Sequence, residues 1–196
     1  MKVVIIKYNA GNIRSVDYAL RRIGIEAILT DDPDIIRRAD KVIFPGQGEA
    51  GTTMSYLRKT GLDSVIRELK QPVLGICIGM QLMCNHSEEG DTECLGIFDA
   101  KVRKFLPSQH EDKVPHMGWN SLSCLRGTLF DNLPENPHVY FVHSYYVPLM
   151  NDTSATCDYI QPFSAAMEKD NLFAMQFHPE KSGAIGETIL NNFMKL

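Results

Sequence analysis

The sequence has no apolar run long enough to cross a bilayer, and the apolar stretch near its start is too short for a signal peptide. We therefore expect no membrane span and a cytoplasmic protein. Cysteines are few and irregularly spaced, with no C-x-x-C pair among Cys77, Cys84, Cys94, Cys124 and Cys157. This pattern disfavours a zinc or redox centre, so we predict free thiols in a reducing compartment, no metal site and no cofactor.

An excess of charge is also missing. The 20 lysines and arginines against 24 aspartates and glutamates give a formal net charge of -4. Nucleic-acid-binding proteins and polybasic membrane-binding proteins need a clear positive surplus, so both classes are disfavoured. The 196 residues, of which 44% are hydrophobic, contain no repeat or long linker and predict a single domain over residues 1–196.

Strand and helix patterns alternate through the first half of the chain. Strands are predicted at residues 2–8, 26–29, 41–44 and 72–76, and helices at 13–23, 32–39, 52–57, 62–69 and 78 to about 86. Residues 95–147 then favour strands and turns, and an amphipathic helix ends the chain. The predicted fold is α/β, an open, mostly parallel sheet flanked by helices, with an added antiparallel strand section.

A candidate nucleophile lies between the fourth strand and the helix that follows it. Gly75-Ile76-Cys77-Ile78-Gly79 is a thiol version of the G-x-S-x-G elbow, in which small neighbours permit a sharp strand-to-helix turn. The helix N-terminus favours the Cys77 thiolate, and the Ile78 N–H is a candidate oxyanion donor. A buried structural cysteine is an equally good interpretation of this motif taken alone. Cys84 is expected farther along the same helix as a packing residue.

A thiol nucleophile needs a base and a group that orients the base. His178 and Glu180 flank a proline at the end of a predicted strand, where ligands of open α/β sheets bind. In extended backbone both side chains project to one side, so Glu180 can hold one ring nitrogen while the other faces Cys77. A solvent-exposed turn is the alternative for this segment, and His116 and His143 are the rival bases.

Taken together, GICIGMQ and QFHPE resemble the Cys-His-Glu class I glutamine amidotransferases. The resemblance narrows to the glutaminase subunits of imidazole glycerol phosphate synthases through KYNAGNIRSVDYAL, FPGQGEA, LGIFDAKVRKF, VPHMGWN, YFVHSYY and QFHPEKSG, in this order. PHMGWN and GNIRS are the segments that select this subfamily. The resemblance extends from residue 3 to the last helix and implies one glutamine amidotransferase type 1 domain.

The resemblance also implies a role for individual residues. Cys77 attacks the glutamine side-chain amide, His178 transfers protons and Glu180 orients His178. The other implied positions are Ile78, Gly46 and Gln47 at the oxyanion hole, Gln81, Glu89, His143, Ser144 and Tyr145 around glutamine, and Asn12, Trp119 and Lys181 at a partner surface.

The implied partner is a cyclase subunit with a (β/α)₈-barrel fold, in a heterodimer. Ammonia released at Cys77 passes through the barrel to PRFAR, which is converted to imidazole glycerol phosphate and AICAR in histidine biosynthesis. An oxyanion hole that forms only in the loaded complex would gate this reaction, since one donor contributes roughly 10²–10³ in rate. The chain departs from the family pattern at Lys7-Tyr8-Asn9 and at Gln47 in the oxyanion loop.

Three other functions stay open. The chain could serve anthranilate, aminodeoxychorismate or pyridoxal phosphate synthesis, or be a catalytically idle regulatory relative, or be a general thiol hydrolase. Three implied interface residues also have simpler interpretations. Trp119 could be a core residue, Lys181 a solvated charge and Asn12 a helix cap.

Overall fold

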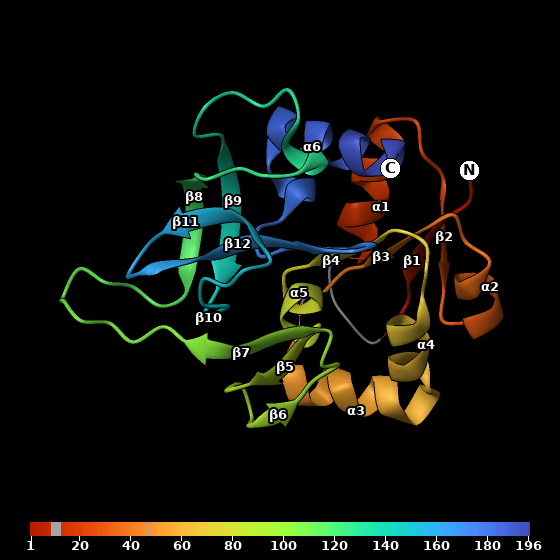
Figure 1. Cartoon of the computed structure of the whole chain (residues 1–196), viewed down its shortest axis with the longest axis horizontal. Helices are drawn as coiled ribbons and strands as arrows, with labels where there is room; N and C mark the ends of the chain where they lie inside the picture. Colours follow the sequence, from red (N-terminus) through yellow and green to blue (C-terminus); the bar gives the residue numbers. More distant parts are fainter. Residues whose placement is uncertain (9–12, 47) are drawn as a thin grey trace.

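The computed structural model describes residues 1–8, 13–46 and 48–196. Its centre is a seven-stranded sheet in the order β11-β12-β13-β4-β3-β1-β2 (Figure 1). Five strands are parallel: β1 (Val3–Ile6), β2 (Ala27–Thr30), β3 (Lys41–Phe44), β4 (Val73–Ile76) and β13 (Leu172–Met175). The hairpin of β11 (Thr153–Asp158) and β12 (Pro162–Lys169) adds two antiparallel strands at one edge.

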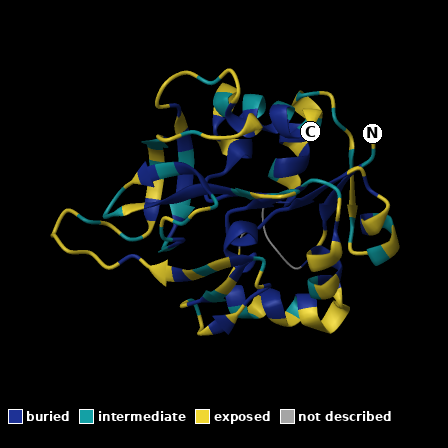
Figure 2. Cartoon of the chain, viewed as in Figure 1, coloured by how far each residue is buried: buried dark blue, intermediate teal, exposed yellow. Residues whose placement is uncertain are grey.

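Helices cover both faces of this sheet, which confirms the predicted fold class. In Figure 1, α1 (Ile13–Arg22) and α6 (Gly183–Lys195) lie above the sheet, and α3 (Ala50–Thr60), α4 (Leu62–Glu68) and α5 (Ile78–Leu82) lie below it. The short α2 (Pro33–Arg37) packs against α4 and β1. Alternate residues of β1 enter the two cores, Val3 and Ile5 on one face and Val4 and Ile6 on the other. Figure 2 shows the central strands buried along their length.

The predicted antiparallel section includes the β11–β12 hairpin and two smaller sheets, of which the first contains one parallel strand pair. One has the order β10-β7-β5-β6, made of β10 (Tyr145–Tyr146), β7 (Phe98–Lys104), β5 (Cys84–Ser87) and β6 (Thr92–Glu93). The other pairs β8 (His116–Ser121) with β9 (His138–His143) in antiparallel register. Two 3₁₀ turns complete the fold, η1 (Thr128–Phe130) and η2 (Pro179–Lys181). Near the end of the 95–147 segment, where strands and turns were predicted, β9 and β10 are separated by one residue and lie in different sheets.

One predicted helix is too long. The helix after the elbow ends at Leu82, not near residue 86, and Cys84 begins strand β5. The carbonyl of Met83 accepts hydrogen bonds from the backbone N–H groups of Ile97 and Phe98, both at 2.9 Å, and this turns the chain out of the helix. Cys84 is fully buried at the start of the strand, in the packing role expected for it.

In the part of the chain that the structure describes, no helix combines the length and the apolar character needed to cross a membrane.

Candidate active site

Four parallel strands bring the candidate residues to one edge of the sheet. Because β1, β3, β4 and β13 run in the same direction, the segments that follow them meet at their carboxyl ends. Tyr8 follows β1, Gly46 follows β3, Cys77 follows β4 and His178 follows β13. The parallel sheet thus joins segments that lie about 170 residues apart in the sequence.

Cys77 adopts a strained backbone conformation at the tip of the elbow. Its φ is 53° and its ψ is -109°, an uncommon conformation for a residue with a side chain. A Cβ on Gly79 would collide with the carbonyl oxygen of Phe44, and a Cβ on Gly75 would lie 2.9 Å from the Met83 sulfur. The two glycines are therefore required by close packing, as the motif predicts, and they hold Cys77 at the start of α5.

His178 and Glu180 form a buried pair beneath this elbow. The Nδ1 of His178 donates to Oε1 of Glu180 at 2.7 Å, and each side chain is 1% exposed. Glu180 reaches the ring from the 3₁₀ turn η2, not from the extended backbone that the sequence suggested. The backbone of His178 is fixed at both ends, because its N–H donates to the Tyr140 carbonyl at 2.9 Å and its carbonyl accepts from Ser182 Oγ at 2.6 Å.

The second ring nitrogen of His178 is available to the thiol. Within the described part of the chain, no nitrogen or oxygen atom bonds to Nε2 of His178, which is buried. Burial by itself lowers the pKa of His178, but its interactions with Cys77 and Glu180 outweigh burial and raise the pKa to about 10. A raised pKa favours the imidazolium beside a thiolate, which is the state that a cysteine nucleophile needs.

The elbow opens into a cavity of about 320 Å³. Seven of the predicted site residues line it: Cys77, Ile78, Gln81, Glu89, His143, Ser144 and Tyr145. The others that line it are Gly48, Pro115 and Val142. Its size and its mixed polar and apolar walls suit a molecule the size of an amino acid.

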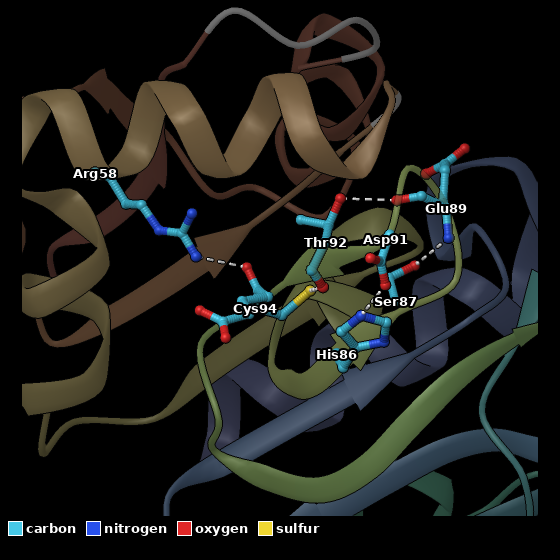
Figure 3. A network of polar contacts seen from close by, with 8 residues as sticks. Arg58, His86, Ser87, Glu89, Asp91, Thr92 and Cys94 are labelled. Atoms are coloured by element: carbon cyan, nitrogen blue, oxygen red, sulfur yellow. Dashed lines mark hydrogen bonds and ion pairs between the residues drawn. The ribbon is translucent and has the colours of Figure 1, made fainter.

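Glu89 enters the cavity from the turn between β5 and β6, shown in Figure 3. Its N–H donates to Ser87 Oγ at 3.1 Å, and its carbonyl accepts from Thr92 Oγ1 at 2.7 Å. The carboxylate accepts from the Ala50 N–H at 2.9 Å, at the start of α3. Burial, opposed by this hydrogen bond and reinforced by the neighbouring Glu49, raises the pKa of Glu89. Glu89 is thus a fixed acidic group in the cavity wall.

His143 and His116 lie together on β9 and β8. The Nδ1 of His143 is 2.7 Å from the Tyr145 carbonyl oxygen, and its Nε2 is 3.0 Å from Nδ1 of His116. Burial lowers the pKa of His116 to about 4 and that of His143 to about 3. Both rings are therefore neutral near pH 7 and already bonded. Of the three candidate bases, His178 alone forms the carboxylate pair.

The oxyanion loop is packed closely against the elbow. A Cβ on Gly46 would collide with the Ile78 side chain and with the Tyr8 hydroxyl. That hydroxyl donates a buried hydrogen bond to the Pro45 carbonyl. Tyr8, one of the positions at which the chain differs from the family pattern, therefore holds this loop in place. Burial and the nearby Cys77 raise the pKa of Tyr8. Gln47 lies outside the described residues.

The predicted partner residues lie on a separate surface. Trp119 is 56% exposed, and its ring packs edge-on against Tyr140 with 6.1 Å between ring centroids. The Nζ of Lys181 lies 5.7 Å from the same Tyr140 ring. The fold therefore unites Trp119 and Lys181 around one tyrosine. Asn12 lies outside the described residues.

Sequence reasoning missed one residue of this site. Gln176 is fully buried, and its Nε2 lies 3.6 Å from the Cys77 sulfur. Its Oε1 accepts from Gln81 Nε2 at 2.9 Å. The available signal was its position two residues before His178 in the QFHPE segment, which in an extended chain places both side chains on one side.

Comparison with known proteins agrees with this geometry. The family model "Glutamine amidotransferase class-I" matches residues 4–196. A solved glutamine amidotransferase shares 20% identity with the chain at a TM-score of 0.75, covering 98% of this chain and 97% of its own. PurLQS from Thermotoga maritima shares 17% identity at a TM-score of 0.69, covering 99% of this chain and 97% of its own. At these identities the two structures support the fold alone.

Relatives at higher identity narrow the family. The HisH subunit of imidazole glycerol phosphate synthase of Bacteroides fragilis (strain YCH46) is 63% identical over 196 residues, which is the full length of both chains. The HisH subunit of Yersinia pseudotuberculosis is 44% identical, again over the full length of both chains. The chain belongs to the class I glutamine amidotransferase family and, within it, to the HisH subunits of imidazole glycerol phosphate synthase.

Proposed function

We propose that this chain hydrolyses glutamine to glutamate and ammonia, with Cys77 as nucleophile, His178 as general acid and base, and Glu180 as the residue that orients His178. The observation that carries the proposal is the buried Cys77–His178–Glu180 group at the wall of an amino-acid-sized cavity. Membership of an amidotransferase family supports the choice of a carboxamide substrate.

The proposed reaction has two halves. The Cys77 sulfur attacks the carboxamide carbon, the C–N bond breaks, and the His178 imidazolium gives its proton to the departing nitrogen, which leaves ammonia and a thioester. Neutral His178 then takes a proton from water, whose oxygen attacks the thioester carbon. The C–S bond breaks, glutamate leaves, and the thiolate–imidazolium pair is restored.

Two regions stabilise the substrate in this proposal. The Ile78 N–H, at the start of α5, is the proposed donor to the developing oxyanion, and Gly46 and Gln47 are the other proposed oxyanion residues. The cavity residues Gln81, Glu89, His143, Ser144 and Tyr145 surround the rest of glutamine. The acidic side chain of Glu89 suits the substrate ammonium group, because opposite charges attract strongly in a partly buried site.

The partner in this proposal is the cyclase subunit, a (β/α)₈ barrel that forms a heterodimer with this chain. Support comes from the relatives, which are named as subunits of imidazole glycerol phosphate synthase. The barrel receives ammonia and converts PRFAR to imidazole glycerol phosphate and AICAR in histidine biosynthesis. Trp119, Lys181 and Asn12 are the proposed contact residues. The cysteines are all free, which supports a reducing, cytoplasmic setting.

The test is glutamate release from glutamine by the purified chain alone, with the cyclase subunit, and with the cyclase subunit plus PRFAR. We expect strong stimulation in the last mixture and none in Cys77→Ser. A complex that forms but releases no glutamate would overturn the proposed chemistry. Glutamate release that PRFAR and the cyclase leave unchanged would instead favour an amidotransferase of another pathway.

A further inference from the structure

The Cys77 sulfur has a buried neighbour outside the proposed triad. Gln176 is fully buried, and its side-chain amide lies between two groups. On one side Nε2 is 3.6 Å from the Cys77 sulfur, and on the other Oε1 is 2.9 Å from Nε2 of Gln81. Buried amides are held by hydrogen bonds at both ends, so the identity of the end that faces the sulfur decides what Gln176 does there.

A backbone carbonyl fixes that identity. The two ends of a glutamine amide have nearly the same shape, so their order must come from their partners. The Tyr145 carbonyl can only accept, and the amide end of Gln81 that lies 3.1 Å from it must therefore be the NH₂ group. That NH₂ group has a second hydrogen, which points to Gln176. The oxygen of Gln176 must face Gln81, and its NH₂ group must face the sulfur.

We propose that Gln176 is a fourth catalytic residue, which donates an N–H to the Cys77 sulfur and stabilises the thiolate. A donor beside sulfur favours the anion over the neutral thiol, because hydrogen bonds to charged acceptors are about twice as strong as neutral ones. The proton of His178 moves during the reaction, whereas the Gln176 donor is present throughout. This inference rests on the proposed role of Cys77 as nucleophile.

The effect of Gln176 on the Cys77 thiolate can be measured separately from the effects of the titratable groups around the sulfur. Cys77 raises the pKa values of two titratable groups near it, His178 and Tyr8. Glu180 also raises the pKa of His178, and His178 in turn contributes to lowering the pKa of His143. A substitution at position 176 leaves all four of these groups in place, so a change in thiolate formation reports on the lost donor.

The experiment measures the rate of Cys77 alkylation by iodoacetamide against pH in the full chain, with Cys77→Ser giving the background from the other cysteines. Methionine has nearly the shape of glutamine but no donor. In Gln176→Met we expect the half-maximal pH to rise by about one unit and the rate at pH values well below it to fall roughly tenfold, since a hydrogen bond to a charged group contributes that much. The kcat for glutamine falls with it.

Asn192→Leu is the matched structural control. Buried Asn192 on α6 donates from Nδ2 to the carbonyls of Leu129 at 3.1 Å and Asp131 at 2.9 Å, so this variant loses one buried and one partly buried hydrogen bond. We expect it to melt at lower temperature with an unchanged alkylation profile. An equal shift in both variants would show general loosening of the fold and overturn the proposal.

A second measurement leaves Gln176 intact. In the wild-type chain, the side-chain NH₂ resonances of Gln176 should move with the titration of Cys77 and stay constant in Cys77→Ala. The proposal would be overturned by Gln176 NH₂ resonances that do not change as Cys77 titrates. It would also be overturned by a folded Gln176→Met variant whose alkylation profile against pH matches that of the wild type. A wild-type Cys77 that alkylates no faster than the Cys77→Ser background would instead overturn the proposed nucleophile.

Discussion

His116 donates from Nδ1 to Nε2 of His143 across 3.0 Å, and the direction of this hydrogen bond is set by the backbone. The Tyr145 carbonyl accepts from Nδ1 of His143, so a neutral His143 has no proton on Nε2. Asn120 donates to the remaining nitrogen of His116 at 3.4 Å. Asn120, His116 and His143 thus each donate to the next group in a series that ends at the Tyr145 carbonyl, which also accepts a hydrogen bond from Gln81.

This pair predicts a stability that falls with acid. Burial lowers the pKa of both histidines, to about 4 for His116 and about 3 for His143. Unfolded histidine binds a proton near pH 6.5, so below that pH the unfolded state binds more protons and the free energy of unfolding falls until pH drops below the folded values. In His116→Gln, the slope between pH 6.5 and 4.5 should decrease by about 1.4 kcal/mol per pH unit.

Urea unfolding across this pH range checks the prediction. His138→Gln is the control, since His138 is an exposed histidine on the neighbouring strand β9. Equal slopes of unfolding free energy against pH in the wild type and His116→Gln would contradict the prediction. His178 does not interfere, because its pKa is raised to about 10, and the stability it contributes is complete below pH 6.5 and lost as pH rises through 10.

Glu180→Gln should weaken catalysis without removing the nucleophile. The carboxylate is one of the two groups that raise the pKa of His178 against burial, so its loss lowers that pKa and shortens the pH range of the imidazolium–thiolate pair at the alkaline end. We expect kcat to fall roughly 10²-fold, the lower range for losing a positioned acid–base group. Glu187→Gln breaks an exposed ion pair with Arg22 and serves as control. Identical pH–rate profiles for Glu180→Gln and wild type would exclude this role.

Gly79→Ala should damage the elbow itself. The new Cβ would collide with the Phe44 carbonyl, which belongs to β3 and cannot move alone, so we expect a loss of about 1–3 kcal/mol in unfolding free energy. Gly51→Ala is the matched control, because in the first turn of α3 its Cβ meets first the end of the Glu49 side chain at 3.0 Å, the carboxylate that caps this helix, and not strand backbone. Alanine favours helix by up to about 1 kcal/mol over glycine, which offsets the adjustment of Glu49, so this control should lose less stability than Gly79→Ala. Thermal melts of the two variants that coincide would refute the packing explanation.

Local patterns were enough to predict the sheet and the meeting of the motifs. Alternating strand and helix signals give parallel order, and parallel order brings strand ends to one edge, so Cys77 and His178 could be placed together before any coordinates. The elbow glycines were also predictable, because a sharp turn beside packed backbone leaves no room for Cβ atoms.

Long-range contacts explain what the sequence did not predict. The helix from Ile78 was expected to continue to about residue 86, but backbone hydrogen bonds from Ile97 and Phe98 to Met83 end it. The role of Gln176 depends on Gln81 and on the Tyr145 carbonyl, which comes from a different sheet. Such partners are separated by about 14 to 95 residues and leave no local pattern.

Trp119→Ala should separate partner binding from chemistry at Cys77. The ring is 56% exposed on β8 and is held against Tyr140, whose ring also lies 5.7 Å from Lys181 Nζ, so a large apolar surface is presented in a fixed orientation. Exposed, well-supported tryptophans contribute about 2 kcal/mol or more at interfaces, which predicts affinity for the cyclase subunit at least about 30-fold weaker.

Ile28→Ala, at a 42% exposed position on edge strand β2, is the control. Titration calorimetry measures the affinity, and alkylation of Cys77 in the isolated chain should be the same in all three proteins. Unchanged affinity in Trp119→Ala would remove this surface from the interface, whereas slower alkylation in the isolated variant would mean that Trp119 supports the site from within.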